Sequence, residues 1–261
     1  MAFDLSSISP TGRARPPRII MLGVEKIGKS TFASQAPAPI FIPIKREEGI
    51  DGIDVPQFPT CETFLDTAEC LKTLLEGEHK YSTVVVDSTS ALEPLIHQAV
   101  CDKSGVESIE KYDGGYGKGY TESLSYFRTL TDLLDLLRER KGMLSILIGH
   151  VKIKRFDDPT GASYDKYYMD INDRAHNALF RWADAILFAN TKVLVKTEDA
   201  GFGKTIGKGK DITEGQRFLY TQQRPSHPGG GRGVYGRLPY EIPLSWNAYA
   251  AAITDVSKKE E

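Results

Sequence analysis

The sequence has little cysteine, no clustered histidine and no long apolar run, and each shortage argues against a class of protein. The three cysteines, Cys61, Cys70 and Cys101, form no C-x-x-C pair, as is typical of a reduced, intracellular protein without a disulfide framework. The five histidines lack the H-x3-H and H-E-x-x-H spacings of zinc sites. No window approaches roughly 18 apolar residues, and the first seventeen residues have no continuous apolar stretch. We therefore expect neither a membrane span nor a signal peptide.

A strong charge of one sign is also missing. The formal net charge is −2, with 40% hydrophobic and 26% charged residues among 261, which is ordinary for a single globular α/β domain with appendages. Any binding of a polyanion must come from local basic segments. One such segment is 196–237, where eight Lys or Arg face four acids among ten glycines, a local charge of +4.

What is present is an alternation of apolar runs and helical patterns. Strands are expected at 18–22, 40–44, 82–87, 143–149, 184–195 and 217–223. Helices are expected from the segment stopped by Pro37 and at 62–77, 91–101, 121–141 and 172–183. Uninterrupted apolar strands between amphipathic helices predict an α/β fold, with a mostly parallel sheet flanked by helices on both faces.

Three regions are expected along the chain. Residues 1–17 read as a flexible N-terminal arm, either disordered or docked on a neighbouring subunit. Residues 18–195 hold the core. Residues 196–261 add basic Gly-rich loops, extra strands and a C-terminal helix that continue the same domain.

The segment 23-GVEKIGKS-30 has the G-x-x-x-x-G-K-[ST] spacing of a phosphate-binding loop, and it follows an expected strand and opens an expected helix. Backbone N–H groups and the helix N-terminus would hold the phosphates. Lys29 would reach the β- and γ-phosphates, Ser30 would ligate Mg²⁺ and Thr31 would touch the α-phosphate. The segment predicts ATP and Mg²⁺ as ligands. The candidate nucleotide-binding residues are Gly23, Val24, Glu25, Lys26, Ile27, Gly28, Lys29, Ser30 and Thr31.

Three further side chains stand at expected strand ends. Asp87 ends a buried strand and is the candidate to hold Mg²⁺ or its water, the alternative being a helix cap. Glu47 and Glu48 follow another strand and are candidates for the base that activates water, or else solvated acids. His150 ends a third strand, where it would sense the γ-phosphate or serve a structural role. Lys29, Glu47, Asp87 and His150 form the predicted catalytic set.

These residues resemble those of RecA recombinases. RecA has Gly-Pro-Glu-Ser-Ser-Gly-Lys-Thr at its phosphate loop, so Glu25 stands where RecA has its glutamate. Segment 84–94, VVVDSTSALEP, looks like the RecA strand that binds Mg²⁺. Segment 41–51, FIPIKREEGID, is similar to the strand that ends in the RecA catalytic glutamate, and the match falls on Glu47. RecA has Gln where this chain has His150.

The closest overall likeness is to small phage-encoded RecA-like ATPases of AAA type, over about residues 18–195 and more loosely 217–250. The resemblance implies a RecA-like P-loop NTPase core. Some members of that group promote single-strand annealing and recombination together with a single-strand binding protein.

Two basic, aromatic segments stand where RecA has its DNA-binding loops, 111–120 and 151–172. Basic groups can follow phosphates while tyrosines stack on bases, although the tyrosines can also be ordinary loop packing. The candidate DNA-binding residues are Lys111, Tyr116, Lys118, Tyr120, Lys152, Lys154 and Arg155.

The predicted function is Mg²⁺-dependent ATP hydrolysis coupled to binding of single-stranded DNA, in the cytoplasm of an infected bacterial host if the protein is phage-encoded. A single-strand DNA-binding protein and further copies of the chain are expected partners. An arginine supplied in trans would come from Arg224, Arg232 or Arg237. The alternatives are a motor or helicase-loader-type ATPase and, below it, a small-molecule kinase.

Overall fold

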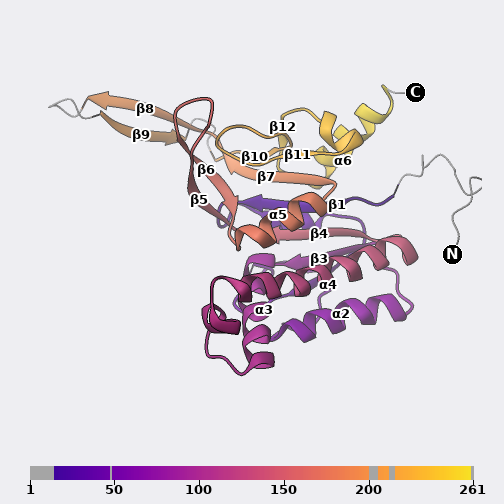
Figure 1. Cartoon of the computed structure of the whole chain (residues 1–261). Helices are drawn as coiled ribbons and strands as arrows, with labels where there is room; N and C mark the ends of the chain where they lie inside the picture. The colour runs from indigo at the N-terminus through magenta and orange to yellow at the C-terminus, as the bar shows by residue number, and fades with distance from the viewer. Residues whose placement is uncertain (1–14, 48, 200–204, 212–214, 260–261) are drawn as a thin grey trace, which may run out of the picture.

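The structure is a computed structural model that describes residues 15–47, 49–199, 205–211 and 215–259 (Figure 1). Most of the predicted N-terminal arm and Glu48 therefore lie outside the described residues. Among the described helices, none is long and apolar enough to cross a membrane.

The described residues form a main sheet of eight strands in the order β12-β10-β7-β1-β4-β3-β2, with β11 pairing with β7 off this path. The strands β2, β3, β4, β1 and β7 run parallel to one another, whereas β10, β11 and β12 join the sheet through antiparallel pairs. The strand bounds are β1 Arg18–Gly23, β2 Pro39–Pro43, β3 Thr83–Asp87, β4 Leu144–Gly149, β7 Ala185–Thr191, β10 Arg217–Tyr220, β11 Gly230–Gly231 and β12 Glu241–Pro243.

Helices cover both faces of this sheet. Successive residues of a strand point to opposite faces, and in β1 the residues on both faces are apolar and buried. Ile20 and Leu22 of β1 pack on one side with residues of α2, α3, α4 and α5, whereas Ile19 and Met21 pack on the other side with residues of α1 and α6. Figure 1 shows α2, α3 and α4 on one side of the sheet and α6 on the other. The predicted α/β fold with a mostly parallel, doubly covered sheet is confirmed. The helix bounds are α1 Lys29–Ser34, α2 Phe64–Glu76, α3 Thr89–Ser104, α4 Lys118–Arg140, α5 Asp173–Trp182 and α6 Trp246–Ser257.

Two expectations about local structure were wrong. Segment 151–172, expected as a loop, forms an antiparallel hairpin of β5 (Val151–Phe156) and β6 (Tyr164–Met169). The strand expected at 184–195 stops at Thr191, and the chain continues into a second hairpin of β8 (Val193–Asp199) and β9 (Thr205–Asp211), which projects away from the main sheet (Figure 1).

The C-terminal segment packs on the helix that follows β1. The ring of Trp246 lies 5.4 Å from the ring of Phe32 in α1, and the Trp246 backbone N–H donates to Oε1 of Gln35 at 3.1 Å. Tyr249 is fully buried and also contacts Phe32, with ring centroids 5.9 Å apart. The C-terminal helix α6 therefore packs against α1, the helix that begins at the predicted phosphate loop.

Candidate nucleotide site

Both glycines of the phosphate-loop pattern are required by the local backbone. A β-carbon on Gly23 would lie 2.6 Å from the carbonyl oxygen of Ala189, so only glycine lets β1 pack this closely against β7. Gly28, directly before α1, has φ of 107°, a left-handed conformation that glycine adopts without strain. The loop therefore enters α1 with its backbone close to the neighbouring strand, as a phosphate cradle requires.

Lys29 is a buried cation held by the loop itself. Its side chain is 6% exposed, and Nζ donates hydrogen bonds of 3.0 Å to the carbonyl oxygens of Gly23 and Val24. Burial lowers the pKa of Lys29, and the charges of Asp87, Glu47 and Glu25 oppose that shift. A buried ammonium of this kind is electrostatically suited to an anionic phosphate.

Ser30 and Asp87 meet at the start of α1. The Ser30 hydroxyl donates to Oδ2 of Asp87 at 2.7 Å. Burial raises the pKa of Asp87, the Ser30 hydrogen bond opposes this, and the nearby Glu47 charge adds to it. A hydroxyl and a carboxylate are oxygen donors of the kind Mg²⁺ prefers. Within the described part of the chain, no three His, Cys, Asp or Glu residues cluster to hold a metal. A magnesium ion here would therefore need oxygen ligands from the nucleotide and water as well.

Glu47 and His150 are bonded to each other, which the sequence did not predict. Nε2 of His150 lies 2.8 Å from Oε1 of Glu47, and the same oxygen accepts a 2.6 Å hydrogen bond from the Ser88 hydroxyl. The His150 backbone N–H donates to the Ser90 hydroxyl at 3.0 Å. Burial would raise the pKa of Glu47, but the hydrogen bonds from His150 and Ser88 outweigh it, so the net shift is downward.

The residues of the predicted catalytic set line a single cleft of about 640 Å³. Lys29, Glu47, Asp87 and His150 all line it, together with phosphate-loop residues 25–31. A second cleft of about 630 Å³ adjoins the first. Both clefts are lined by Glu25, Arg46, Glu47 and His150.

Three lining residues of the nucleotide cleft were missed by sequence reasoning. They are Arg46, Gly49 and Arg217. Arg217 comes from β10, far along the chain, and only the strand order places it there.

The segment 111–120 is held by acids within it and directly before it. It joins the short 3₁₀ segment η2 (Ile109–Gly114) to the first turn of α4. Lys118 pairs with Asp113 at 2.9 Å, and the Tyr120 hydroxyl donates to Glu110 at 2.9 Å. Lys111 pairs likewise with Glu107. Tyr116 is the exception, because its side chain is 98% exposed.

The hairpin β5–β6 carries the second group of DNA candidates. Lys152, Lys154 and Arg155 pair with Asp170, Asp173 and Asp157, respectively. The rings of Tyr167 and Tyr168 contact those of Phe188 and His176, respectively, at tilted angles and thus contribute to packing.

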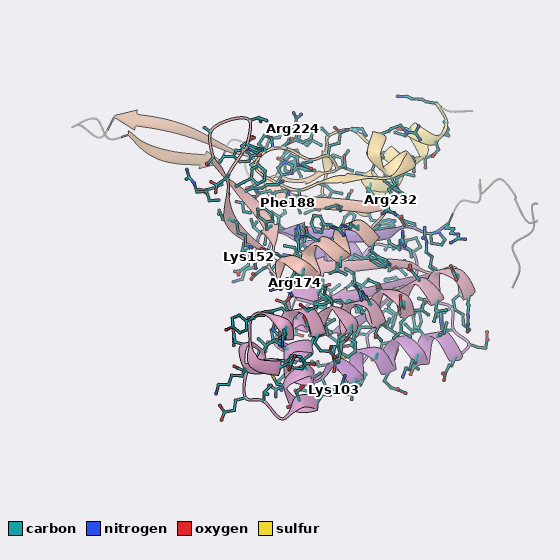
Figure 2. The ribbon with its side chains drawn as sticks, viewed as in Figure 1. Lys103, Lys152, Arg174, Phe188, Arg224 and Arg232 are labelled. Carbon is teal, nitrogen blue, oxygen red and sulfur yellow. The ribbon has the colours of Figure 1, made fainter. Side chains whose placement is uncertain are left out.

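The two candidate DNA segments approach each other through the helix that follows the hairpin. Arg174 of α5 donates from Nη1 to the Gly117 carbonyl at 3.1 Å. Lys152 and Arg174 lie near the base of the hairpin in Figure 2.

The arginines considered for action in trans have other surroundings. The Arg224 guanidinium lies 4.1 Å from the centre of the Tyr240 ring. Arg232 pairs with Asp184, which directly precedes β7. Asp184 therefore lies at the N-terminal end of the parallel strands, and the phosphate loop lies at their C-terminal end. Arg237 lies on the short 3₁₀ segment η3 (Gly233–Arg237).

A glycine-rich loop between a parallel strand and a helix, with a buried lysine at the helix start and a strand-end aspartate beside it, defines a P-loop NTPase-like fold. The chain belongs to the AAA_24 family, an AAA domain, whose model matches residues 15–233. This affiliation supports nucleotide binding and suggests ATPase activity.

Two relatives extend the comparison. The chain is 23% identical over 173 residues to the SPbeta prophage-derived uncharacterized protein YorG of Bacillus subtilis (strain 168), a match that covers 64% of this chain and 50% of YorG. The chain thus spans about half the length of that relative. The crystal structure of the RadB recombinase aligns with 78% of this chain and 91% of its own, at 16% identity and a TM-score of 0.40, an overlap too loose to carry an argument about function.

Proposed function

We propose that the protein binds and hydrolyses ATP with Mg²⁺ and couples this cycle to binding of single-stranded DNA in phage recombination or strand annealing. The main support is that one cleft brings together the buried Lys29, the hydrogen-bonded pair of Ser30 and Asp87, and Glu47. Glu47 in turn accepts hydrogen bonds from two side chains. Mg²⁺, when bound, would neutralise phosphate charge and polarise the bond that breaks.

The chain's own residues divide the work. Lys29, at the start of α1, would supply positive charge to the phosphates of bound ATP, and the loop N–H groups would add their dipoles. The Ser30 hydroxyl and the Asp87 carboxylate would supply oxygen ligands to the metal. Glu47 is the base that takes a proton from the attacking water. Hydrogen bonds from His150 and Ser88 lower its pKa, so its carboxylate stays ionised as the pH falls.

His150 connects this base to the candidate DNA surface. It contacts Glu47 on one side and precedes β5 directly, so a change in its hydrogen bond acts at the root of the hairpin. The basic and aromatic residues of the hairpin, with Tyr116 on the adjoining segment, support contact with a single strand. A partner single-strand binding protein and assembly of several copies belong to the same proposal.

The test is ATP hydrolysis with and without single-stranded DNA for the wild type, Lys29→Ala, Glu47→Gln and Lys26→Ala. We expect DNA to stimulate the wild type, and Lys29→Ala and Glu47→Gln to lose roughly 100-fold or more, the cost of removing one group that stabilises transition-state charge. Glu47→Gln should still bind ATP.

Lys26→Ala is the comparison within the same loop. Lys26 also lines the cleft but is exposed, whereas Lys29 is buried, so loss of the Lys26 side chain should change the rate only modestly. Hydrolysis that ignores DNA but depends on a small-molecule acceptor would contradict the proposal in favour of a kinase. A Lys26→Ala protein as inactive as Lys29→Ala would show that the loop is arranged differently.

A further inference from the structure

Arg217 reaches the nucleotide cleft from outside the parallel core. It begins β10, whose antiparallel partner β7 is itself the parallel neighbour of β1, the strand that leads into the phosphate loop. Its backbone is fixed on both sides of the strand, by register with Thr191 and by a 3.0 Å hydrogen bond from the Leu244 N–H to its carbonyl. The side chain therefore extends from a defined backbone position.

The guanidinium lies against the phosphate loop. A β-carbon built on Gly28 would lie 3.1 Å from Nη1 of Arg217 and 3.7 Å from Leu244. Arg217 lines the same cleft as Lys29, Asp87 and Glu47 while its own side chain stays exposed. An exposed cation thus stands beside the loop residue that precedes the phosphate lysine.

The charges in the cleft give this arginine a role. Lys29 faces the carboxylates of Asp87, Glu47 and Glu25, which all act on its pKa. An incoming polyphosphate adds several negative charges to a cleft that already holds these three acids. A guanidinium is suited to this task, because its fork of N–H donors matches phosphate oxygens and its charge persists at any ordinary pH.

We propose that Arg217 is a nucleotide-binding residue that supplies, from the same chain, a positive charge to the phosphates of bound ATP. The inference rests on the proposed function, since it assumes that this cleft holds ATP. It adds a cis cation from the antiparallel extension to a site otherwise built by the parallel core. It also links the C-terminal strands to nucleotide occupancy, because Arg217 and Leu244 are bonded through the backbone.

The experiment measures equilibrium binding of a fluorescent ATP analogue to the wild type, Arg217→Ala, Arg217→Gln and Arg217→Lys. We expect Arg217→Ala and Arg217→Gln to weaken binding about tenfold or more, as for a charge-assisted contact to phosphate. Arg217→Lys should recover part of the loss, since it keeps the charge. The dependence of affinity on salt should be shallower for Ala and Gln than for the wild type.

Lys192→Ala is the matched control, because Lys192 lies beside the same strand pair but contacts Glu241 and the Phe218 ring and does not line the cleft. It should bind ATP like the wild type. Equal affinity of Arg217→Ala and wild type would overturn the inference and leave the proposed function standing. Recovery by Gln but not by Lys would also overturn it, since that pattern indicates stacking on the base. A wild type that binds no nucleotide would overturn the proposed function and this inference with it.

Discussion

Glu47 shows how a single residue is tuned by neighbours that are distant in the chain. Burial alone would raise its pKa, and the donors on His150 and Ser88 reverse that direction. A base with a lowered pKa stays ionised as the pH falls, so the acid limb of ATP hydrolysis in the wild type should lie at low pH.

Removing His150 should therefore move that limb. In His150→Ala the burial of Glu47 remains while one pKa-lowering donor is lost, so the pKa of Glu47 rises and the acid limb shifts to higher pH. The measurement is kcat/KM against pH, each variant scaled to its own plateau. His79→Ala, beyond the end of α2, should leave the profile unchanged. An acid limb that stays in place in His150→Ala would show that Glu47 does not titrate as the base.

The residue pattern predicted the phosphate loop because its groups are close in sequence. Lys29 and Ser30 are set by local spacing, and the acid at the end of a buried strand picked out Asp87. Local spacing could not predict the hydrogen bond between Glu47 and His150 or the position of Arg217 in the cleft. Both depend on which strands become neighbours, and the order β10-β7-β1-β4-β3-β2 is decided by packing of the whole sheet rather than by any short segment.

At the scale of elements, the hairpin β5–β6 was missed although it left a signal. The segment VKIKRF alternates between apolar and polar residues, and Pro159, Thr160 and Gly161 supply a turn before YDKYYM. Four of the twelve residues in VKIKRF and YDKYYM are Lys or Arg, and Asp165 adds further charge, a composition also typical of an exposed basic loop. The predicted core helices lie within a few residues of their observed bounds. In α2, α4 and α5 the apolar residues recur at helical spacing along one face, which is the signal that predicted them.

The hairpin also gives a prediction about DNA. The double variant Lys152→Ala, Lys154→Ala should weaken binding of single-stranded DNA and reduce the slope of log affinity against log salt by about 1–2, since each lysine that neutralises a phosphate contributes roughly one to that slope. The measurement is a salt titration of DNA binding in the presence of ATP. Because both lysines have acidic partners, part of their charge is already compensated.

Lys103→Ala provides the control for that titration. Lys103 is an exposed lysine of α3 that also has an acidic partner, Glu122, and it lies far from Lys152 in Figure 2. Its loss should leave the slope unchanged. An equal change in both variants would mean that net charge, and not the hairpin, sets the affinity.

At the scale of the whole molecule, the C-terminal helix supports the phosphate loop. Trp246 is 8% exposed and packs on Phe32 in α1 and on Tyr249 in its own helix. Trp246→Ala should cost about 3–5 kcal/mol of the free energy of unfolding, the usual cost of truncating a buried aromatic side chain. It should also weaken ATP binding, since α1 begins at Lys29.

Denaturant titration with and without ATP measures both effects. The exposed Leu65→Ala is the control, since its side chain is 71% exposed and lies on α2, across the sheet from α6. A Trp246→Ala protein that is destabilised yet binds ATP with wild-type affinity would show that α1 holds its position without α6.

The point where β7 ends beside the start of β10, called here the joint, affects how the length of such chains can change among relatives. Thr191 and Arg217 are register partners, although the hairpin β8–β9 lies between them in sequence. A segment whose two ends already face each other across a ladder can be lengthened, exchanged or removed without cutting the sheet, and loop length itself costs little free energy. We therefore expect this joint to tolerate large differences in length among relatives. It is also a practical point at which to insert a reporter domain, directly beside a cation of the nucleotide cleft.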